Sequence, residues 1–318
     1  SVIQYSNNPA WIFFDYLTNT RYGLGNDIKL TDAQKDALYA DIYYASWWCL
    51  VAPISGNTTQ RLATFNGVFY GAESKYEALQ KIADSFHGKF VYINGNPRLI
   101  FDGQGYNWSA TNHSGTATIN FSAQVNHVVN QSNSADLTYQ SGSLENLFNV
   151  INVKWNNPEN HHRQEEVQYR NSASITKYGE RETTVELTGC TSKQQALWYG
   201  AWMYETEASN SEMVTYIAGW DHYSIEPGML LHIADTLRVD ETETGGRVTA
   251  VNGATLTIDR DIGASTNVVV LDNNNDPILG TGSGTTLTMD ANYTYEVGAV
   301  FNTYSGTFVP THRVVAIE

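Results

Sequence analysis

The chain has 318 residues, 42% of them hydrophobic, and 33 acidic against 18 basic residues give a net charge of −15. This apolar content can build packed cores, so a disordered chain is excluded. No run of about 18 apolar residues predicts a membrane helix. An acidic surface repels phosphate, so we expect no sequence-specific nucleic-acid binding. The opening stretch SVIQYSNNPA lacks a basic segment before an apolar one and is not a signal peptide.

The first predicted helix covers residues 8–18, with Pro9 near its first turn. It is rich in aromatic residues, and its one-sided aromatic face is expected to pack on the helices that follow. Gly23 and Gly25 come next and indicate a hinge with a backbone conformation closed to residues that have a Cβ.

A second helix is predicted over residues 30–51, because Thr31 and Gln34 form a capping box at its start. Its apolar side chains fall on two lines of helical spacing, and this wide arc predicts that both flanks are covered. The first line is Leu38, Ile42, Ala45 and Cys49, and the second is Tyr39, Tyr43 and Trp47.

A third helix is predicted over residues 74–88, starting with the capping box of Ser74 and Glu77 and stopping at Gly88. A hairpin over residues 89–103 should turn at Asn94-Gly95. The predicted buried stripe of the helix is Tyr76, Leu79, Ile82, Ala83 and Phe86.

Residues 103–143 change to a composition of Ser, Asn, Gly and Thr, which is typical of exposed loops around weak strands and marks a linker zone. We therefore predict an α+β fold with two domains. An α+β domain covers 1–143, and a mainly antiparallel β, barrel-like hub domain covers 144–318. A small β insertion is expected at about 236–300 within the second domain.

The second domain is predicted to open with a helical turn that runs into a strand over residues 143–160, where Ile151, Val153 and Trp155 alternate with polar residues. The chain then returns as an antiparallel strand over 165–171. A capped helix follows, beginning near Thr191 or Ser192, and strands are expected at 212–223 and 229–235, with a turn at 225–228.

Residues 236–318 are β by pattern throughout. A hairpin over 246–260 turns on Asn252-Gly253. Short strands with frequent turns predict a small barrel or sandwich rather than βαβ units. The further predicted strands are 267–272, 285–290, 295–301 and 311–318.

Two carboxylates near aromatic residues raise the hypothesis of a glycoside hydrolase. Asp221 and Glu226 lie near Trp220 and Tyr223, and sugar hydrolysis uses paired carboxylates beside aromatic platforms. The structural alternative is that Glu226 belongs to a turn, while Asp221 stands at a strand end, solvated or paired with an arginine. A related hypothesis is a glycan-binding module.

Tyr106 and Trp108 would be the aromatic platform of such a glycan-binding module. The alternative for these rings is the edge of a core or a subunit interface, where Tyr and Trp are enriched.

Three oxygen-bearing side chains have the spacing of the first ligands in a calcium loop: Asp272, Asn274 and Asp276. Pro277 replaces the glycine of such a loop and Ser283 stands at its closing position, so a solvated hairpin turn is the favoured interpretation. The adjacent His161 and His162 are interpreted as solvated turn residues. We predict no metal site and no cofactor.

The chain has two cysteines, Cys49 and Cys190, which lie far apart in sequence. Two such thiols are more often free and buried than joined in a disulfide, and two cannot hold a structural zinc alone.

Seven segments, in order, resemble blocks of the tip attachment (host specificity) protein J family of long-tailed bacteriophages. Residues 103–143 and 261–296 match no block. The matching segments are 8–25 (NPAWIFFDYLTNTRYGLG), 65–99, 149–158 (NVINVKWNNP), 175–203, 225–235 (IEPGMLLHIAD), 245–262 and 311–318 (THRVVAIE).

The resemblance implies a structural baseplate hub at the virion tail tip of a phage or prophage, with no catalytic residue. Such hubs are assembled in the bacterial host cytoplasm as homotrimers that close the tail tube. They hold the end of the tape-measure protein, contact other tail proteins and open for DNA ejection. A host surface receptor would be contacted through more distal modules.

Overall fold

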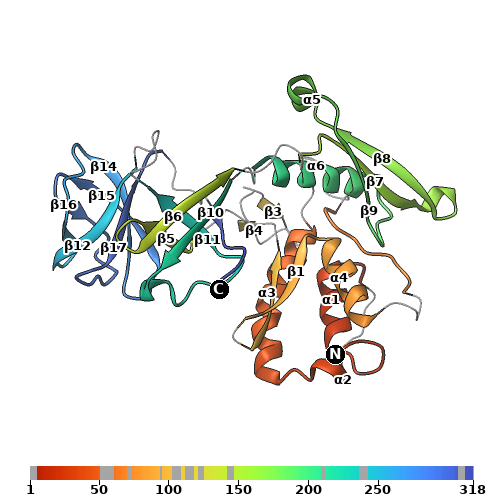
Figure 1. The fold of residues 1–318 in the computed structure, drawn as a ribbon. Helices are drawn as coiled ribbons and strands as arrows, with labels where there is room; N and C mark the ends of the chain where they lie inside the picture. The colour runs from red at the N-terminus through yellow and green to blue at the C-terminus, as the bar shows by residue number, and fades with distance from the viewer. Residues whose placement is uncertain are drawn as a thin grey trace. The chain divides into compact units, whose positions relative to one another are not determined.

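A computed structural model gives the structure of the protein (Figure 1). The chain forms two compact units, which we call the helical unit (residues 1–122 and 141–211) and the barrel unit (residues 123–140 and 212–318). None of the described helices combines the length and apolar composition needed to cross a membrane. The structure describes residues 6–50, 61–69, 74–93, 95–101, 109–111, 118–120, 125–141, 147–209, 212–235, 243–306 and 312–317.

The predicted α+β class is confirmed: most helices lie in the first part of the chain, and strands dominate the last part. The predicted domain boundary at 143/144 is a statement about which segments fold independently, and it stays a prediction. Strands are present within the expected linker zone 103–143, as β5 (His127–Asn130) and β6 (Ser134–Ser141). Apart from Ser141 these two strands belong to the compact barrel unit, so the linker does not extend over them.

Helix α1 (Pro9–Thr18) is confirmed, and the Asn8 side chain caps it by accepting a hydrogen bond from the Ala10 N–H at 3.1 Å. The short α2 (Gly25–Ile28) was not predicted. Neither Gly23 nor Gly25 has a positive φ, and the hinge at these residues stays a prediction. Their role is steric: a Cβ on Gly23 would lie 1.8 Å from the Tyr16 carbonyl oxygen.

Helix α3 (Asp32–Leu50) begins as predicted, since the Gln34 N–H donates to Thr31 Oγ1 and the Thr31 N–H to Gln34 Oε1. Its first apolar line is fully buried. The second line is not covered as predicted, because Tyr39 is 48% and Tyr43 is 43% exposed. The pattern identified the core face and overestimated its width.

Helix α4 (Lys75–Asp84) carries both bonds of the predicted capping box. It ends four residues before Gly88, which instead begins β1 (Gly88–Ile93); β1 pairs antiparallel with β2 (Asn96–Phe101) in the predicted hairpin. Asn94 of the turn lies outside the described residues. Four residues of the predicted stripe are buried, whereas Tyr76 is 56% exposed.

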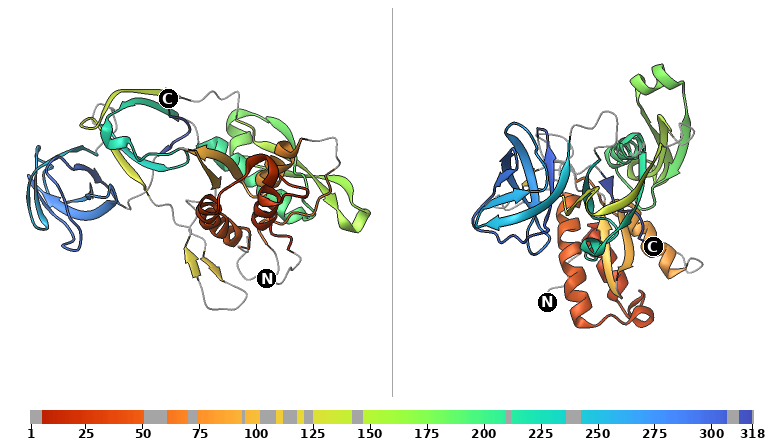
Figure 2. Two further views of the ribbon diagram at one scale, coloured as in Figure 1. Left: turned by 90° about the horizontal axis from the view of Figure 1, so that it is seen from below. Right: turned by 60° about the vertical axis from the view of Figure 1, so that its left-hand side comes forward.

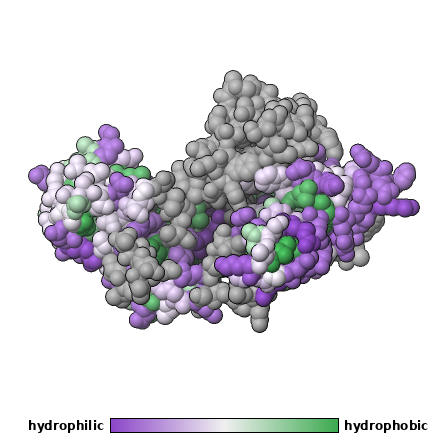
Figure 3. Space-filling model, turned by 90° about the horizontal axis from the view of Figure 1, so that it is seen from above, coloured by the Kyte–Doolittle hydropathy of each residue, from purple (hydrophilic) through white to green (hydrophobic). Residues whose placement is uncertain are grey.

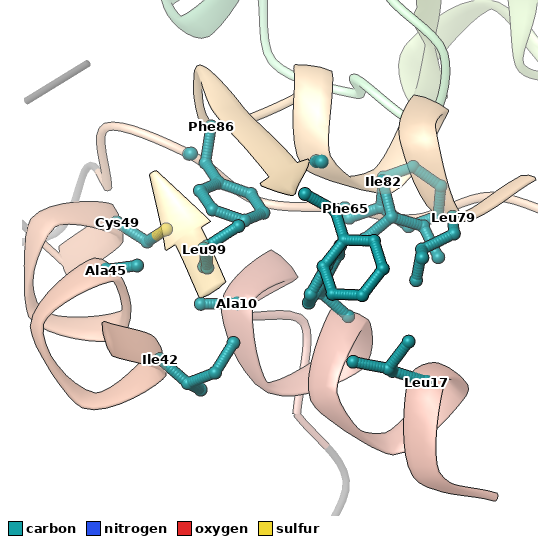
Figure 4. Packing of buried hydrophobic residues seen from close by; sticks show 14 of the residues in the cluster. Ala10, Leu17, Ile42, Ala45, Cys49, Phe65, Leu79, Ile82, Phe86 and Leu99 are labelled. Carbon is teal, nitrogen blue, oxygen red and sulfur yellow. The ribbon is translucent and has the colours of Figure 1, made fainter. Parts of the chain in front are cut away.

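The core of the helical unit lies between α1, α3, α4 and the β1–β2 hairpin (Figure 4). Phe13 of α1 is fully buried and packs with its edge toward Phe86 and Phe90, at centroid distances of 6.3 and 5.9 Å. The aromatic helix of the sequence is therefore scaffold, as expected from its one-sided face.

The rest of the helical unit is a three-stranded sheet with β7 (Val150–Asn157) at its centre. Its antiparallel neighbour β8 (Arg163–Arg170) is confirmed, and α6 (Lys193–Ser209) packs on these strands. Ile151, Val153 and Trp155 are buried as predicted. No helical turn is present at residues 147–149, the described part of that prediction. The sequence did not predict α5 (Ser172–Tyr178), β9 (Glu182–Glu186), which runs parallel to β7, or the hairpin of β3 (Ser109–Thr111) and β4 (Thr118–Asn120).

The predicted small barrel is confirmed as a closed barrel of six strands (Figure 2). It spans residues 245–304, close to the predicted insertion, and the predicted strand at 295–301 is displaced toward the C-terminus. In barrel order the strands are β12 (Gly245–Asn252), β13 (Thr255–Ile258), β16 (Thr286–Thr288), β15 (Pro277–Ser283), β14 (Thr266–Leu271) and β17 (Val300–Tyr304).

Beside the barrel, β11 (Leu230–Ala234) pairs in parallel with β5, over 100 residues away in sequence, and antiparallel with β18 (His312–Arg313). A strand was predicted over residues 311–318. In the described part, residues 312–317, only His312 and Arg313 are in a strand. The last pair of the unit is β6 with β10 (Glu212–Ala218).

Candidate functional site

Asp221, the first carboxylate of the hydrolase hypothesis, is held by an arginine. Its Oδ2 accepts from Arg247 Nη2 at 2.6 Å, and the same guanidinium donates to the carbonyl oxygens of Ser132 and Gly298. This is the arginine pairing predicted as the structural alternative. Trp220 beside it is 92% exposed, so this ring is available to a partner.

Glu226, the second carboxylate, lies in the turn between β10 and β11, where its carbonyl oxygen accepts from the Met229 N–H at 3.2 Å. This placement agrees with its interpretation as a turn residue. Tyr106 and Trp108, the glycan platform, lie outside the described residues.

The side chain of Asp272 closes its own turn. Asp272 Oδ1 accepts from the N–H groups of Asn274 and Asp276 at 2.8 and 2.9 Å, so this oxygen already has two donors. The hairpin-turn interpretation therefore fits the geometry. His161 and His162 are exposed in the turn after β7, both with a positive φ. Among the described residues, no cluster of three His, Cys, Asp or Glu side chains could hold a metal ion.

Both cysteines are free and buried, as predicted. Burial raises the pKa of the Cys49 thiol, and it raises the pKa of Cys190 to about 11. A nucleophilic cysteine needs a lowered pKa, so both thiols have a packing role.

The second line of α3 and two partly buried rings of α1 form a continuous aromatic surface, which we call the α3 aromatic face: Trp11, Phe14, Tyr39, Tyr43, Tyr44 and Trp47. Each ring along this surface contacts the next one. The centroid distances are 5.5 Å for Trp11–Tyr39, 6.5 Å for Tyr39–Tyr43 and 6.1 Å for Tyr43–Trp47. Tyr and Trp are enriched in protein interfaces because one ring offers both apolar area and a polar tip. This surface therefore has the composition of a protein contact.

On the face drawn in Figure 3, hydrophobic residues gather only in small patches. The sequence does not predict the α3 aromatic face, because helical spacing alone does not show which flank of the helix is left uncovered.

A buried polar cluster joins strand β5 to the barrel. Asn302 of β17 is fully buried; its Oδ1 accepts from Asn130 Nδ2 at 2.7 Å and its Nδ2 donates to the Val129 carbonyl oxygen at 3.2 Å. Close by in the unit, the rings of His127 and His222 meet edge to face, with a centroid distance of 4.8 Å. Burial lowers the pKa of both imidazoles, that of His127 to about 4.

Comparison with known proteins identifies the class. The family model described as "Putative phage tail protein" matches residues 74–251. This match covers more than half of the chain, and the protein therefore belongs to this family of phage tail proteins. The resemblance to tip attachment protein J that the sequence predicts is confirmed by the relatives below.

Tip attachment protein J of Escherichia phage SECphi27 is 24% identical over 254 residues, which are 78% of this chain and 19% of that protein. The protein of the same name from Escherichia phage SECphi4 is 23% identical over 261 residues, 81% of this chain and 21% of that protein. The chain thus spans about a fifth of the length of these relatives. A solved structure, the 43 kDa tail protein of prophage MuSo2 from Shewanella oneidensis, is 12% identical with a TM-score of 0.32, covering 73% of this chain and 54% of that one.

Proposed function

We propose that this phage tail protein is a component of the tail tip, where it forms part of the baseplate hub that closes the tail tube. In that place it acts in tail assembly, host attachment and DNA ejection. The observation that supports the proposal most directly is that two relatives covering about four fifths of the chain are named tip attachment protein J.

We further propose that the chain is not an enzyme. The pairing of Asp221 with Arg247 supports a structural role for this carboxylate. A screen for polysaccharide hydrolysis with Asp221→Asn and Glu226→Gln as controls tests this point. We expect no turnover above background, and turnover that is lost in both variants would overturn the proposal.

The proposed assembly is a homotrimer around the tail axis, since cyclic symmetry lets one chain form a closed ring. Three copies carry about −45 from the −15 of each chain. An anionic lumen would keep DNA from adsorbing during ejection. The proposed partners are the end of the tape-measure protein and the distal tail proteins, with a host receptor contacted through distal modules. Assembly is expected in the host cytoplasm and the final location is the virion tail tip.

The α3 aromatic face is the surface that we assign to a contact with a neighbouring tail protein. A density map of the intact tail tip, determined by electron microscopy, tests the whole proposal. We expect three copies around the axis with acidic side chains toward the lumen. A single peripheral copy, or a lumen ringed with Lys and Arg, would contradict it.

A further inference from the structure

Two buried histidines of the barrel unit come from different segments of the chain. His127 begins strand β5, and His222 ends η3 (Trp220–His222), a 3₁₀ turn between β10 and β11. His127 is 1% and His222 is 8% exposed, and their rings meet edge to face. Among the described residues, neither nitrogen of the His222 ring has a hydrogen-bond partner, and the same holds for Nε2 of His127. The His222 ring is therefore held in place by packing rather than by hydrogen bonds.

His222 is the side chain that anchors η3 in the barrel unit. Nearby Trp220 and Tyr223 are 92% and 79% exposed, so moving them costs little buried apolar area. The backbone bonds of η3 are local, because the N–H groups of His222, Tyr223 and Ile225 each donate to the carbonyl oxygen three residues earlier. This segment can therefore move outward without breaking a strand ladder.

Strand β5, which carries the other histidine, is fixed more firmly. It pairs in parallel with β11 over four residue pairs. At its end, Asn130 Nδ2 donates to the Phe301 carbonyl oxygen at 2.9 Å and to Asn302 Oδ1 at 2.7 Å, both on the barrel strand β17. Movement of β5 would break both sets of bonds. If the two imidazole rings separate, the part that moves is therefore η3.

Burial disfavours a charge on either imidazole and is the largest cause that lowers the pKa of both histidines, that of His127 to about 4. The Asp221 carboxylate favours the charged form and Arg247 opposes it at His222, and these two side chains are bonded to each other. The charged and titratable groups of the described residues that face the pair are Asp221 of η3, Arg247 of β12, Tyr216 of β10 and, on the same face of the sheet, His312 of β18.

We propose that His127 and His222 form an acid-sensitive latch, which holds η3 closed at neutral pH and releases it as the pH falls. Their unbonded nitrogens are buried, so a proton reaches these atoms only when η3 moves out. In the open state both rings are hydrated and regain the ordinary histidine pKa of about 6.5. Below that pH the open state binds more protons than the closed state and is therefore favoured. The latch concerns the barrel unit alone and does not depend on the tail-tip role.

Hydrogen exchange of the whole chain, measured by mass spectrometry on peptides from residues 219–225 and from β5, tests this proposal. Division by the intrinsic exchange rate at each pH gives the opening equilibrium constant of each segment. Between pH 7.5 and pH 5.5 the constant of η3 should rise about tenfold for each histidine that becomes protonated on opening, hence by about tenfold to 100-fold. Low urea should leave it unchanged, because a local movement exposes little surface.

Two other results of this experiment would each overturn the proposal. An opening constant of η3 that does not change with pH would show that the turn opens without releasing His222. A constant that rises in acid, and also rises in low urea together with that of β5, would show that the histidines are released by unfolding of the unit. This comparison of η3 with β5 is made on the wild-type chain and needs no variant.

Variants then test whether these two histidines cause the pH dependence. The double variant His127→Phe/His222→Phe keeps two buried rings without an ionisable group, so the opening of η3 should no longer depend on pH. Asp221→Asn weakens the bond to Arg247 and should raise the opening constant at every pH, with the pH dependence retained. The matched control His161→Asn removes an exposed histidine and should change neither quantity. Wild-type pH dependence in the double variant would refute the latch.

Discussion

The two units of this protein are stabilised in different ways. In the helical unit, fully buried rings such as Phe13 and Phe86 fill the space between helices. In the barrel unit, strand β5 is joined to the barrel by Asn130 and Asn302, and two buried histidines lie near the same strand. The stability of an apolar core changes little with pH. The stability that buried polar groups contribute depends on whether each group is hydrogen-bonded and on its protonation state.

The contrast predicts that the two units differ in their tolerance of substitutions. Aromatic packing tolerates apolar substitutions of similar volume, so the core of the helical unit can accept such changes. Buried amides specify one arrangement, because each donor has to meet its own acceptor. The junction of β5 with the barrel is thus fixed in register.

Phe13→Ala should have the largest effect on stability. Phe13 is fully buried against Phe86 and Phe90, and its truncation leaves a cavity. Loss of a buried phenylalanine costs about 3–5 kcal/mol of unfolding free energy. Urea unfolding followed by tryptophan fluorescence reports the helical unit, since Trp220 is the one tryptophan in the sequence of the barrel unit.

The matched control is Tyr44→Ala, which removes an aromatic ring that is 55% exposed on the same face of α3 as Tyr43. We expect a change within about 0.5 kcal/mol. Equal losses for Phe13→Ala and Tyr44→Ala would contradict the assignment of Phe13 to the core.

The second prediction concerns acid stability of the barrel unit. The pKa of His127 is lowered to about 4 by burial, with the nearby His222 lowering it further. Because the unfolded-state pKa is about 6.5, the unfolded chain takes up the proton first as the pH falls. The folded state should therefore lose up to about 3 kcal/mol between pH 6.5 and pH 4 from this residue. His127→Phe should remove this part of the pH dependence.

Hydrogen exchange of peptides from β5 and β11, measured by mass spectrometry across this pH range, is the appropriate readout. His161→Asn removes an exposed histidine, keeps a residue that tolerates the positive φ of this position, and should leave the pH profile unchanged. If His127→Phe kept the full acid sensitivity of the wild type, the burial of a neutral His127 would not be its cause.

The third prediction tests the amide junction. Asn302→Leu removes the partner of Asn130 and leaves the Val129 carbonyl oxygen without that donor. A buried polar group left unsatisfied costs about 1–3 kcal/mol, so we expect a loss of about 2 kcal/mol in the unfolding free energy of the barrel unit. Asn267→Ala on β14 is the control, since Asn267 is exposed. Hydrogen exchange of β5 should rise only in Asn302→Leu.

Local signals predicted much of this fold. Capping boxes located the starts of α3 and α4, and the Asn-Gly pair at residues 252–253 located a barrel hairpin. These signals work because each satisfies backbone groups within a few residues. The ends of elements were less certain, as at Gly88, where a turn and a strand take over from α4.

Long-range partners could not be predicted. The predicted linker zone includes β5 because its polar neighbours suggest loops, whereas its pairing with β11 and its packing on the barrel strands bury it. A small pocket in the helical unit is a similar case, since its wall comes from segments around residues 48, 87 and 200. An arginine partner for Asp221 was expected, but the sequence did not show that this arginine is Arg247.

Ser74→Ala should have the smallest effect on stability of the four substitutions predicted here. It tests whether an exposed polar group of the helical unit matters less than a buried polar group of the barrel unit. Ser74 Oγ accepts from the Glu77 N–H at 3.2 Å and Glu77 Oε2 accepts from the Ser74 N–H at 3.3 Å, both at an exposed helix end. Water can replace these bonds after substitution, so we expect a loss of about 1 kcal/mol. Ser74→Asp retains a capping oxygen and should recover most of this loss in urea unfolding. If Ser74→Ala cost as much as Asn302→Leu, burial would not be what makes the polar groups of the barrel unit sensitive.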